Sequence, residues 1–94
     1  MSNKFWRNKK VLVTGYEGFL GSNLTRALLE LGAKVVGLDI RVRRPGTILT
    51  AADYKNLKVI RGSVANLELV RRIFKKEQPR IVFHLAAEAI VGEC

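Results

Sequence analysis

The sequence predicts an α/β fold, a doubly wound parallel half-sheet of four strands in the order 3-2-1-4 with helices on both faces. First, short β-branched apolar runs alternate along the chain with longer stretches whose apolar residues recur every three or four positions. Second, three glycines separate the first strand from the first helix, as in folds that bind ligands at the carboxyl ends of parallel strands. Strands separated by helices pair in parallel through right-handed crossovers, which favours this topology.

Four apolar runs are the predicted strands, at residues 10–14, 34–39, 58–61 and 80–85. Their valine, leucine and isoleucine content is typical of a parallel sheet that helices cover on both sides. We therefore expect the Ile-Val-Phe run of the fourth strand to be covered on both faces.

The first predicted helix follows the glycines and ends at Gly32, a residue type that commonly stops helices. Its apolar face is expected to consist of Leu20, Leu24, Ala27, Leu28 and Leu31. A second helix begins after Asn66, whose side chain can cap it, and the pair Gln78-Pro79 breaks it. Its predicted apolar face is Leu67, Val70, Ile73 and Phe74, with Glu68 in the first turn. The loop with Arg43-Arg44-Pro45-Gly46 has room for a short helical turn before Tyr54.

Length and composition predict one globular domain, residues 1–94. A doubly wound fold normally spans about two to three times this length, so we expect a truncated version of it. The single cysteine, Cys94, excludes a disulfide within the chain and favours a cytoplasmic location. The N-terminus lacks the apolar segment of a signal peptide, and no run approaches the roughly 20 apolar residues that span a bilayer.

The net charge of +9, from 17 basic and 8 acidic residues, raises the question of an anionic partner such as nucleic acid. The basic residues occur in three separate places, without interleaved aromatic side chains. They are Lys4, Arg7, Lys9 and Lys10 near the N-terminus, Arg41, Arg43 and Arg44 in a loop, and Arg71, Arg72, Lys75 and Lys76 in the second helix. This distribution favours solvated surface charge over nucleic-acid binding.

The glycines Gly15, Gly18 and Gly21 predict a pyrophosphate site in a Rossmann-like fold. Gly15 is expected to turn out of the strand, Gly18 to leave room for phosphates, and Gly21 to let the helix pack close to the sheet. The spacing Gly-x-x-Gly-x-x-Gly departs from the commoner Gly-x-Gly-x-x-Gly, and a tight turn without a ligand is the alternative.

Asp39 ends the second strand, 18 residues after Gly21, where a carboxylate can accept hydrogen bonds from both adenosine ribose hydroxyls. This favours NAD as the cofactor. The arginines that begin at Arg41 keep NADP as the alternative, since one of them could pair with a 2′-phosphate.

Three segments together carry a resemblance to a family: Thr14-Gly15-x-x-Gly18-Phe19-Leu20-Gly21, Asp39, and Val82-Phe83-His84-Leu85-Ala86-Ala87. They resemble the N-terminal part of the extended short-chain dehydrogenase/reductase family, whose members are NAD-dependent sugar-nucleotide epimerases and dehydratases. The opening residues 5–15 are similar to those of CDP-glucose 4,6-dehydratases.

The resemblance implies cofactor contacts at further positions. They are Tyr16, Glu17, Phe19 and Leu20 in the glycine turn, Ile40 and Arg41 beside Asp39, Ser63 and Val64 after the third strand, and Leu85, Ala86 and Ala87 after the fourth. Core packing is the alternative for the alanines. Family members usually carry Gly-Asp before an apolar residue where this chain has Gly62-Ser63-Val64, and a serine hydroxyl is a weaker acceptor for the adenine amino group. His84 is interpreted as a strand histidine without a chemical role.

The family's catalytic Tyr-x-x-x-Lys pair lies on a helix well beyond the fourth strand, with a nearby Ser or Thr and a C-terminal domain for the sugar nucleotide. Tyr54 and Lys58 have this spacing, but they precede the third strand, so we expect the match to be accidental. His84 and Cys94 form neither a zinc site nor a Cys-His pair, and the family suggests serine rather than Cys94. We therefore expect a cofactor-binding portion that lacks catalytic residues and is inactive alone.

A non-enzymatic module that binds a nucleotide or self-associates is the alternative. The fourth strand is expected to expose an unpaired apolar edge, which only Pro79 and Arg80 interrupt. We expect copies of the chain to associate through this edge.

Overall fold

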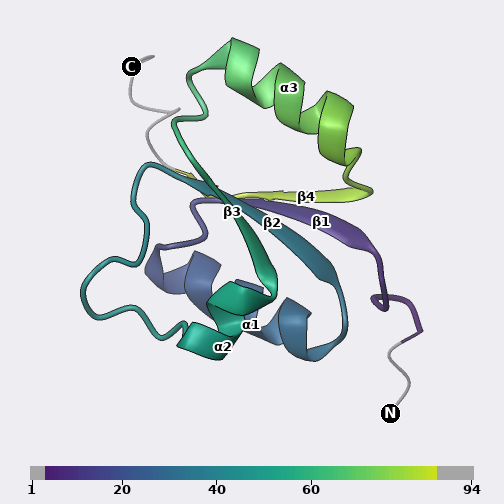
Figure 1. Cartoon of the computed structure of the whole chain (residues 1–94), viewed down its shortest axis with the longest axis vertical. Coiled ribbons are helices and arrows are strands. Elements are labelled where there is room, and N and C mark those ends of the chain that lie inside the picture. Colours follow the sequence, from purple (N-terminus) through teal and green to yellow (C-terminus); the bar gives the residue numbers. More distant parts are fainter. Residues whose placement is uncertain (1–3, 87–94) are drawn as a thin grey trace.

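The computed structural model describes residues 4–86, in which four parallel strands form one sheet. The strand order is β3-β2-β1-β4, as predicted. The strands are β1 (Lys10–Thr14), β2 (Lys34–Asp39), β3 (Leu57–Arg61) and β4 (Ile81–His84). Helices α1 (Phe19–Glu30) and α2 (Ala51–Lys55) lie on one side of the sheet and α3 (Leu67–Glu77) on the other (Figure 1). The α/β prediction is confirmed.

The element boundaries agree closely with the predicted ones. β1 and β2 match, β3 begins one residue earlier, and the ladder continues past both ends of β4. There, the backbone N–H of Arg80 donates to the carbonyl oxygen of Lys10, and that of Leu85 donates to the carbonyl oxygen of Thr14. The short helix α2 includes Tyr54 rather than preceding it. Within residues 4–86, no helix is long and apolar enough to cross a membrane.

Both predicted helix ends are present. Gly32 follows α1 with φ +91°, and its N–H and that of Ala33 donate to the carbonyl oxygens of Leu29 and Leu28, which is the Schellman pattern. At the start of α3, Oδ1 of Asn66 accepts from the N–H of Leu69 at 3.1 Å.

The face of α1 that packs on the sheet differs from the predicted one. Its buried residues are Gly21, Ser22, Thr25 and Leu28. Leu20 is 64% exposed and Ala27 is also exposed, so their predicted burial is wrong. The reason is close approach: a Cβ on Gly21 would lie 2.0 Å from the carbonyl oxygen of Gly15. Small side chains let α1 lie against the glycine turn, and this rotation moves Leu20 to the outside.

The α3 side of the sheet is covered only in part. Ile73 packs on Leu12, Val36 and Leu38, as predicted for the helix face. Leu67 and Phe74 are exposed instead, and so is Val82 of β4. The expected burial of β4 on both faces is therefore wrong in the part of the chain that the structure describes. The cause is that α3 lies over β1 and β2 and leaves the neighbouring surface of β4 open.

Tyr16 fills the space on the α1 side where β1 and β2 end. It is fully buried, and its ring lies so close to Gly37 that a Cβ there would be 2.6 Å from Cδ1 of Tyr16. Burial, reinforced by the negative charge of Glu17, raises the pKa of Tyr16. The hydroxyl makes no hydrogen bond of good geometry within residues 4–86, although it lies near the Glu17 carboxylate, which contributes to the raised pKa. Tyr16 therefore stabilises the turn mainly through the packing of its ring.

Glu17 connects the glycine turn to the loop between β2 and α2. Its carboxylate is fully buried and accepts from the backbone N–H groups of Arg43 at 2.8 Å and Arg44 at 3.1 Å. The hydroxyl of Tyr54 donates to the same carboxylate at 2.6 Å. Burial of Tyr54 and this hydrogen bond raise the pKa of Tyr54. Arg43 has φ +57°, a strained value for an arginine that these contacts hold in place.

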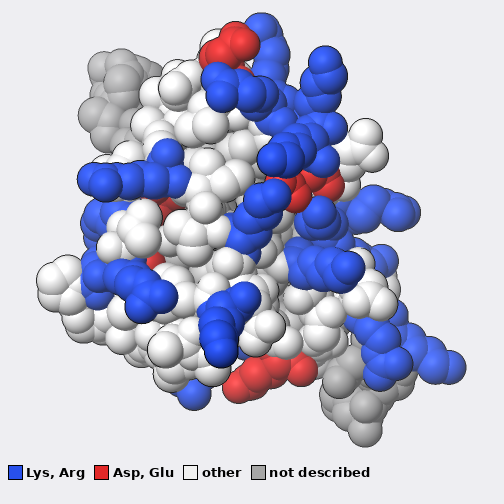
Figure 2. All heavy atoms as spheres, viewed as in Figure 1, with Lys and Arg blue, Asp and Glu red and all other residues white. Residues whose placement is uncertain are grey.

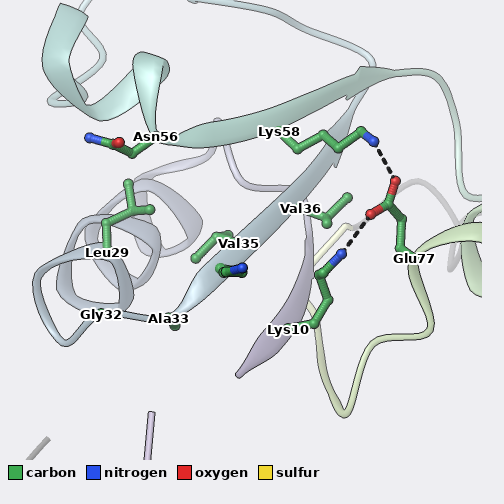
Figure 3. Close-up of a pocket in the computed structure, with 10 residues that line it drawn as sticks. Lys10, Leu29, Gly32, Ala33, Val35, Val36, Asn56, Lys58 and Glu77 are labelled. Atoms are coloured by element: carbon green, nitrogen blue, oxygen red, sulfur yellow. Dashed lines mark hydrogen bonds and ion pairs between the residues drawn. The ribbon is translucent and has the colours of Figure 1, made fainter. Parts of the chain in front are cut away.

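Glu77 performs a similar role at the opposite end of the sheet. From the last turn of α3 it reaches the amino ends of β1 and β3, where its oxygens lie 3.0 Å from Nζ of Lys10 and 2.7 Å from Nζ of Lys58 (Figure 3). The Glu77 side chain is only 5% exposed. Hydrogen bonds from Lys58 and Lys10 lower the pKa of Glu77.

Phenylalanine substitutions of the two buried tyrosines should have opposite effects. Tyr16→Phe removes a hydroxyl without a partner, so the free energy of unfolding should stay constant or rise by up to about 1 kcal/mol. Tyr54→Phe removes a donor to a buried carboxylate and should lower it by about 1–3 kcal/mol. Urea unfolding followed by circular dichroism measures both values. Equal losses in the two variants would contradict these roles.

The Glu77 ion pairs predict a defined dependence of stability on pH. The pKa of Glu77 is lower in the folded than in the unfolded chain, so its stabilisation is present above the ordinary glutamate pKa. That stabilisation is lost as the pH falls through the lowered pKa. Glu77→Gln should reduce the free energy of unfolding at neutral pH by about 1–2 kcal/mol. It should also flatten the decline below about pH 5.

Urea midpoints measured at neutral and acidic pH test this prediction, with Glu30→Gln as the control. Glu30 has a side chain that is 71% exposed and pairs only loosely, at 3.9 Å, with Arg26. If Glu77→Gln and Glu30→Gln gave the same pH profile, the ion pairs would not stabilise the fold.

Candidate functional site

The candidate site lies at the carboxyl ends of β1, β2 and β4, and the glycine turn is its centre. Gly15 leaves β1 with φ +75°, and its N–H donates to the carbonyl oxygen of Leu38 at 2.8 Å. A Cβ on Gly15 would lie 2.9 Å from the backbone nitrogen of Ala86 and from the carbonyl carbon of Leu85. Only glycine fits here, because the end of β4 packs directly against the turn.

The N-terminus of α1 offers a place for an anion. Gly18 is the N-cap, no side chain caps the helix, and the first turn contains no acidic residue. A Cβ on Gly18 would meet only the carbonyl oxygen of Gly15 at 3.4 Å and Nη2 of Arg41 at 3.8 Å. The backbone of Gly18 is therefore open on its outer side, beside a guanidinium group. First-turn N–H groups and the helix dipole favour a phosphate at such a position.

Asp39 lies next to this turn with a buried carboxylate. Its Oδ2 accepts from the N–H of Glu17 at 3.0 Å, and its Oδ1 accepts from the N–H of Arg41 at 3.0 Å. Nε of Arg41 lies 3.5 Å from the same Oδ1. Two carboxylate oxygens offer about four acceptor positions, so this arrangement leaves capacity for a ligand hydroxyl. The Arg41 side chain is 52% exposed and has room to move.

The end of β4 is joined to β1 through Thr14, which sequence reasoning did not include among the site residues. Its hydroxyl oxygen lies 3.0 Å from the backbone nitrogen of Leu85, 3.3 Å from that of Ala86 and 2.8 Å from Nδ1 of His84. The sequence feature that could have indicated this role is a hydroxyl-bearing residue at the last position of the strand, directly before Gly15. Ala87 and Cys94 lie outside the described residues.

The remaining predicted contacts divide into exposed and internal positions. Phe19 and Leu20 are exposed beside the open turn, and Ile40 is exposed next to Asp39. The side chains of Tyr16 and Glu17 are buried, so only their backbone faces the turn. After β3, Ser63 accepts from the N–H of Ala65 at 3.0 Å, and Val64 packs against the α3-side core.

Tyr54 and Lys58 contact different carboxylates, at opposite ends of β1. Tyr54 bonds to Glu17 near the carboxyl end of β1, whereas Lys58 bonds to Glu77, which also contacts Lys10 at the amino end of β1. Their side chains therefore have separate partners, Glu17 and Glu77.

A hollow of about 500 Å³ lies away from the candidate site, at the amino ends of the strands (Figure 3). Its lining includes Lys10, Lys34, Lys58 and Glu77 and none of the predicted cofactor contacts. Basic side chains are not confined to this hollow. Figure 2 shows them spread over the visible face of the molecule, with few carboxylates between them.

The sequence of the chain matches a family of known proteins. Residues 11–94 match the model of the NAD dependent epimerase/dehydratase family. The chain is 33% identical to the CDP-glucose 4,6-dehydratase of Salmonella typhimurium over 97% of its length, covering 26% of that protein. It is 35% identical to a UDP-glucose 4-epimerase of Neisseria meningitidis over 90% of its length, again covering 26% of the relative.

Solved structures share the fold of the chain. The Bordetella bronchiseptica enzyme WbmH, in complex with NAD⁺, superimposes with a TM-score of 0.71 at 38% identity, over 83% of this chain and 26% of the enzyme. The dTDP-glucose 4,6-dehydratase of Bacillus anthracis, in complex with NAD, gives a TM-score of 0.73 at 27% identity, over 87% and 28%. The chain spans about a quarter of the length of these relatives. It belongs to the NAD dependent epimerase/dehydratase family.

Proposed function

We propose that this chain binds NAD at the glycine turn and Asp39. The observation that carries the proposal is the combination of an uncapped helix N-terminus, an open Gly18 and a buried carboxylate at one edge of the sheet. Two of the structurally similar enzymes, WbmH and the Bacillus anthracis dehydratase, are described in complex with NAD. The residues present fit the group, because Gly15 and Gly21 leave no room for a Cβ and the backbone of Gly18 is open between them.

Each part of the site has a defined task in this proposal. The backbone N–H groups at the start of α1 bind the pyrophosphate, and Asp39 accepts hydrogen bonds from the adenosine ribose. Ile40, Ser63 and Val64 flank the adenine, while Leu85 and Ala86 border the cofactor at the end of β4. The nicotinamide, when bound, accepts and returns a hydride.

Arg41 sets the choice between NAD and NADP. In the structure the Arg41 guanidinium lies beside Asp39. Its positive charge partly offsets the negative charge of the carboxylate that faces the proposed ribose position. A 2′-phosphate would bring negative charge next to the buried Asp39, which disfavours NADP. The exposed guanidinium of Arg41 is the group that would accommodate that phosphate, so NADP is the weaker ligand rather than an excluded one.

We further propose that the chain is the cofactor-binding part of a sugar-nucleotide 4,6-dehydratase or 4-epimerase. The relatives with these activities are about four times as long as the matched region. Within the described residues, the Tyr-x-x-x-Lys spacing occurs only at Tyr54 and Lys58, whose side chains bond to different carboxylates. The chain by itself should bind cofactor without turning over a sugar nucleotide.

Calorimetric titration with NAD, NADP and ADP-ribose tests cofactor binding. Asp39→Ala should weaken NAD binding by about 10- to 100-fold, because hydrogen bonds to a charged acceptor are lost. Arg41→Ala should weaken NADP more than NAD. Glu30→Ala, an exposed carboxylate elsewhere on the surface, should bind as the unaltered chain does. Circular dichroism shows whether each variant is folded, and the absence of NAD binding by the folded, unaltered chain would refute the proposal.

A second candidate function, self-association, is favoured by the edge of β4. In residues 4–86 this strand pairs only with β1, and Val82 is 41% exposed. We expect copies to associate through it at micromolar concentration, and Val82→Lys to reduce the association because a charge on an edge strand opposes pairing. Leu67→Lys, at an exposed apolar site on α3, is the control. Analytical ultracentrifugation distinguishes these outcomes, and a monodisperse monomer would exclude association.

A further inference from the structure

His84 and Thr14 are register partners on β4 and β1, at the edge of the sheet that carries the proposed cofactor site. The hydroxyl of Thr14 is buried and lies within hydrogen-bond distance of three groups. They are the backbone N–H of Leu85 at 3.0 Å, the backbone N–H of Ala86 at 3.3 Å and Nδ1 of His84 at 2.8 Å. Leu85 shares its N–H with the carbonyl oxygen of Thr14.

The directions of these hydrogen bonds follow from the chemistry of the groups. A hydroxyl has one proton to donate and two lone pairs to accept with, whereas a backbone N–H can only donate. The two backbone N–H groups therefore donate hydrogen bonds to the hydroxyl oxygen of Thr14. The hydroxyl itself donates its one hydrogen bond to His84. Nδ1 of His84 must then accept, which places the proton of the neutral imidazole on Nε2.

We propose that His84 is a positioning residue for the cofactor site and works in this one neutral tautomer. By accepting a hydrogen bond from the hydroxyl, His84 orients the lone pairs of Thr14 toward the N–H groups of Leu85 and Ala86. Those two residues are the ones against which Gly15 packs, with no room for a Cβ. The inference rests on the proposed function, since Leu85 and Ala86 matter for binding only if the cofactor lies at this edge.

A second proton on the imidazole is incompatible with this arrangement. Protonation adds an N–H at Nδ1, which would face an oxygen whose lone pairs are already used, and it leaves the hydroxyl proton without an acceptor. His84 is exposed, so water is the other partner available to its ring. A cavity of about 200 Å³ beside His84 is lined from β1, β2, β4 and α3, and its other members are Leu12, Thr14, Leu38, Val64, Val70, Ile73, Phe74 and Val82. None of them is titratable or charged.

The tautomer can be measured directly, because His84 is the only histidine of the chain. Long-range ¹H–¹⁵N correlation spectra of the ¹⁵N-labelled chain should show Nδ1 unprotonated and Nε2 protonated at high pH. Thr14→Ser keeps the hydroxyl and should keep this pattern. Thr14→Val removes it at nearly equal volume and should relax the ring to the tautomer mixture of free imidazole. A protonated Nδ1, or the same mixture in all three proteins, would overturn the inference.

The functional consequence is tested by titrating NAD into the His84 variants at one pH. His84→Asn places an amide oxygen where Nδ1 lies, so it should bind NAD about as tightly as the unaltered chain. His84→Ala, which has no acceptor, should bind NAD about 3- to 10-fold more weakly.

Failure of the proposed function and failure of this inference give different results. If no variant binds NAD while the tautomer pattern and its response to Thr14→Val are as expected, the cofactor proposal fails and the Thr14–His84 contact is only structural. If NAD binds equally well to the unaltered chain and to a folded His84→Ala variant, cofactor binding stands and the positioning role of His84 is refuted.

Discussion

Close packing of backbone against backbone at the glycine turn is the constraint on which the rest of this structure depends. A Cβ on Gly21 would lie 2.0 Å from the carbonyl oxygen of Gly15, and a Cβ on Gly15 would lie 2.9 Å from the backbone of Ala86. The turn thus determines how α1 approaches the sheet and where the end of β4 lies. Because the helix must sit so close, its inner face consists of small residues, and its uncapped N-terminus opens toward the edge where the strands end.

Buried carboxylates fix the loops around that turn. Removing a carboxylate from water is costly unless hydrogen bonds replace the lost hydration, and in this structure backbone N–H groups supply most of them. Asp39 bonds to the N–H of Glu17, and Glu17 in turn bonds to the N–H groups of Arg43 and Arg44. Hydrogen bonds therefore link the end of β2 to the glycine turn, and the glycine turn to the loop that follows β2. The same contacts explain why the side chain of Glu17, which lies between the glycines in the sequence, is buried against the loop that follows β2.

The sequence was sufficient for the features that depend on local pattern. Strand order, the Gly32 stop and the Asn66 cap follow from periodicity and residue type, and all three are present. The inner face of α1 could not be predicted from hydrophobic periodicity, because that pattern places the apolar Leu20 on the buried face and ignores Gly21. The role of Glu17 could not be predicted either, since its partners are N–H groups of a loop far along the chain, whose conformation no residue pattern encodes. The contacts of Thr14 could not be predicted for the same reason, because its partners are groups at the end of another strand.

The charge distribution has a kinetic consequence. The net charge is +9, and Lys and Arg side chains are spread over the face seen in Figure 2 rather than gathered at one opening, which gives that face a positive potential. Such a potential raises the frequency with which any phosphate-bearing molecule collides with the protein, but it does not orient the collision. Orientation is left to short-range geometry, at the open backbone of Gly18 beside Arg41. The association rate of an anion would thus depend on ionic strength and little on which anion it is. Its dissociation rate would depend on how well it fits the glycine turn.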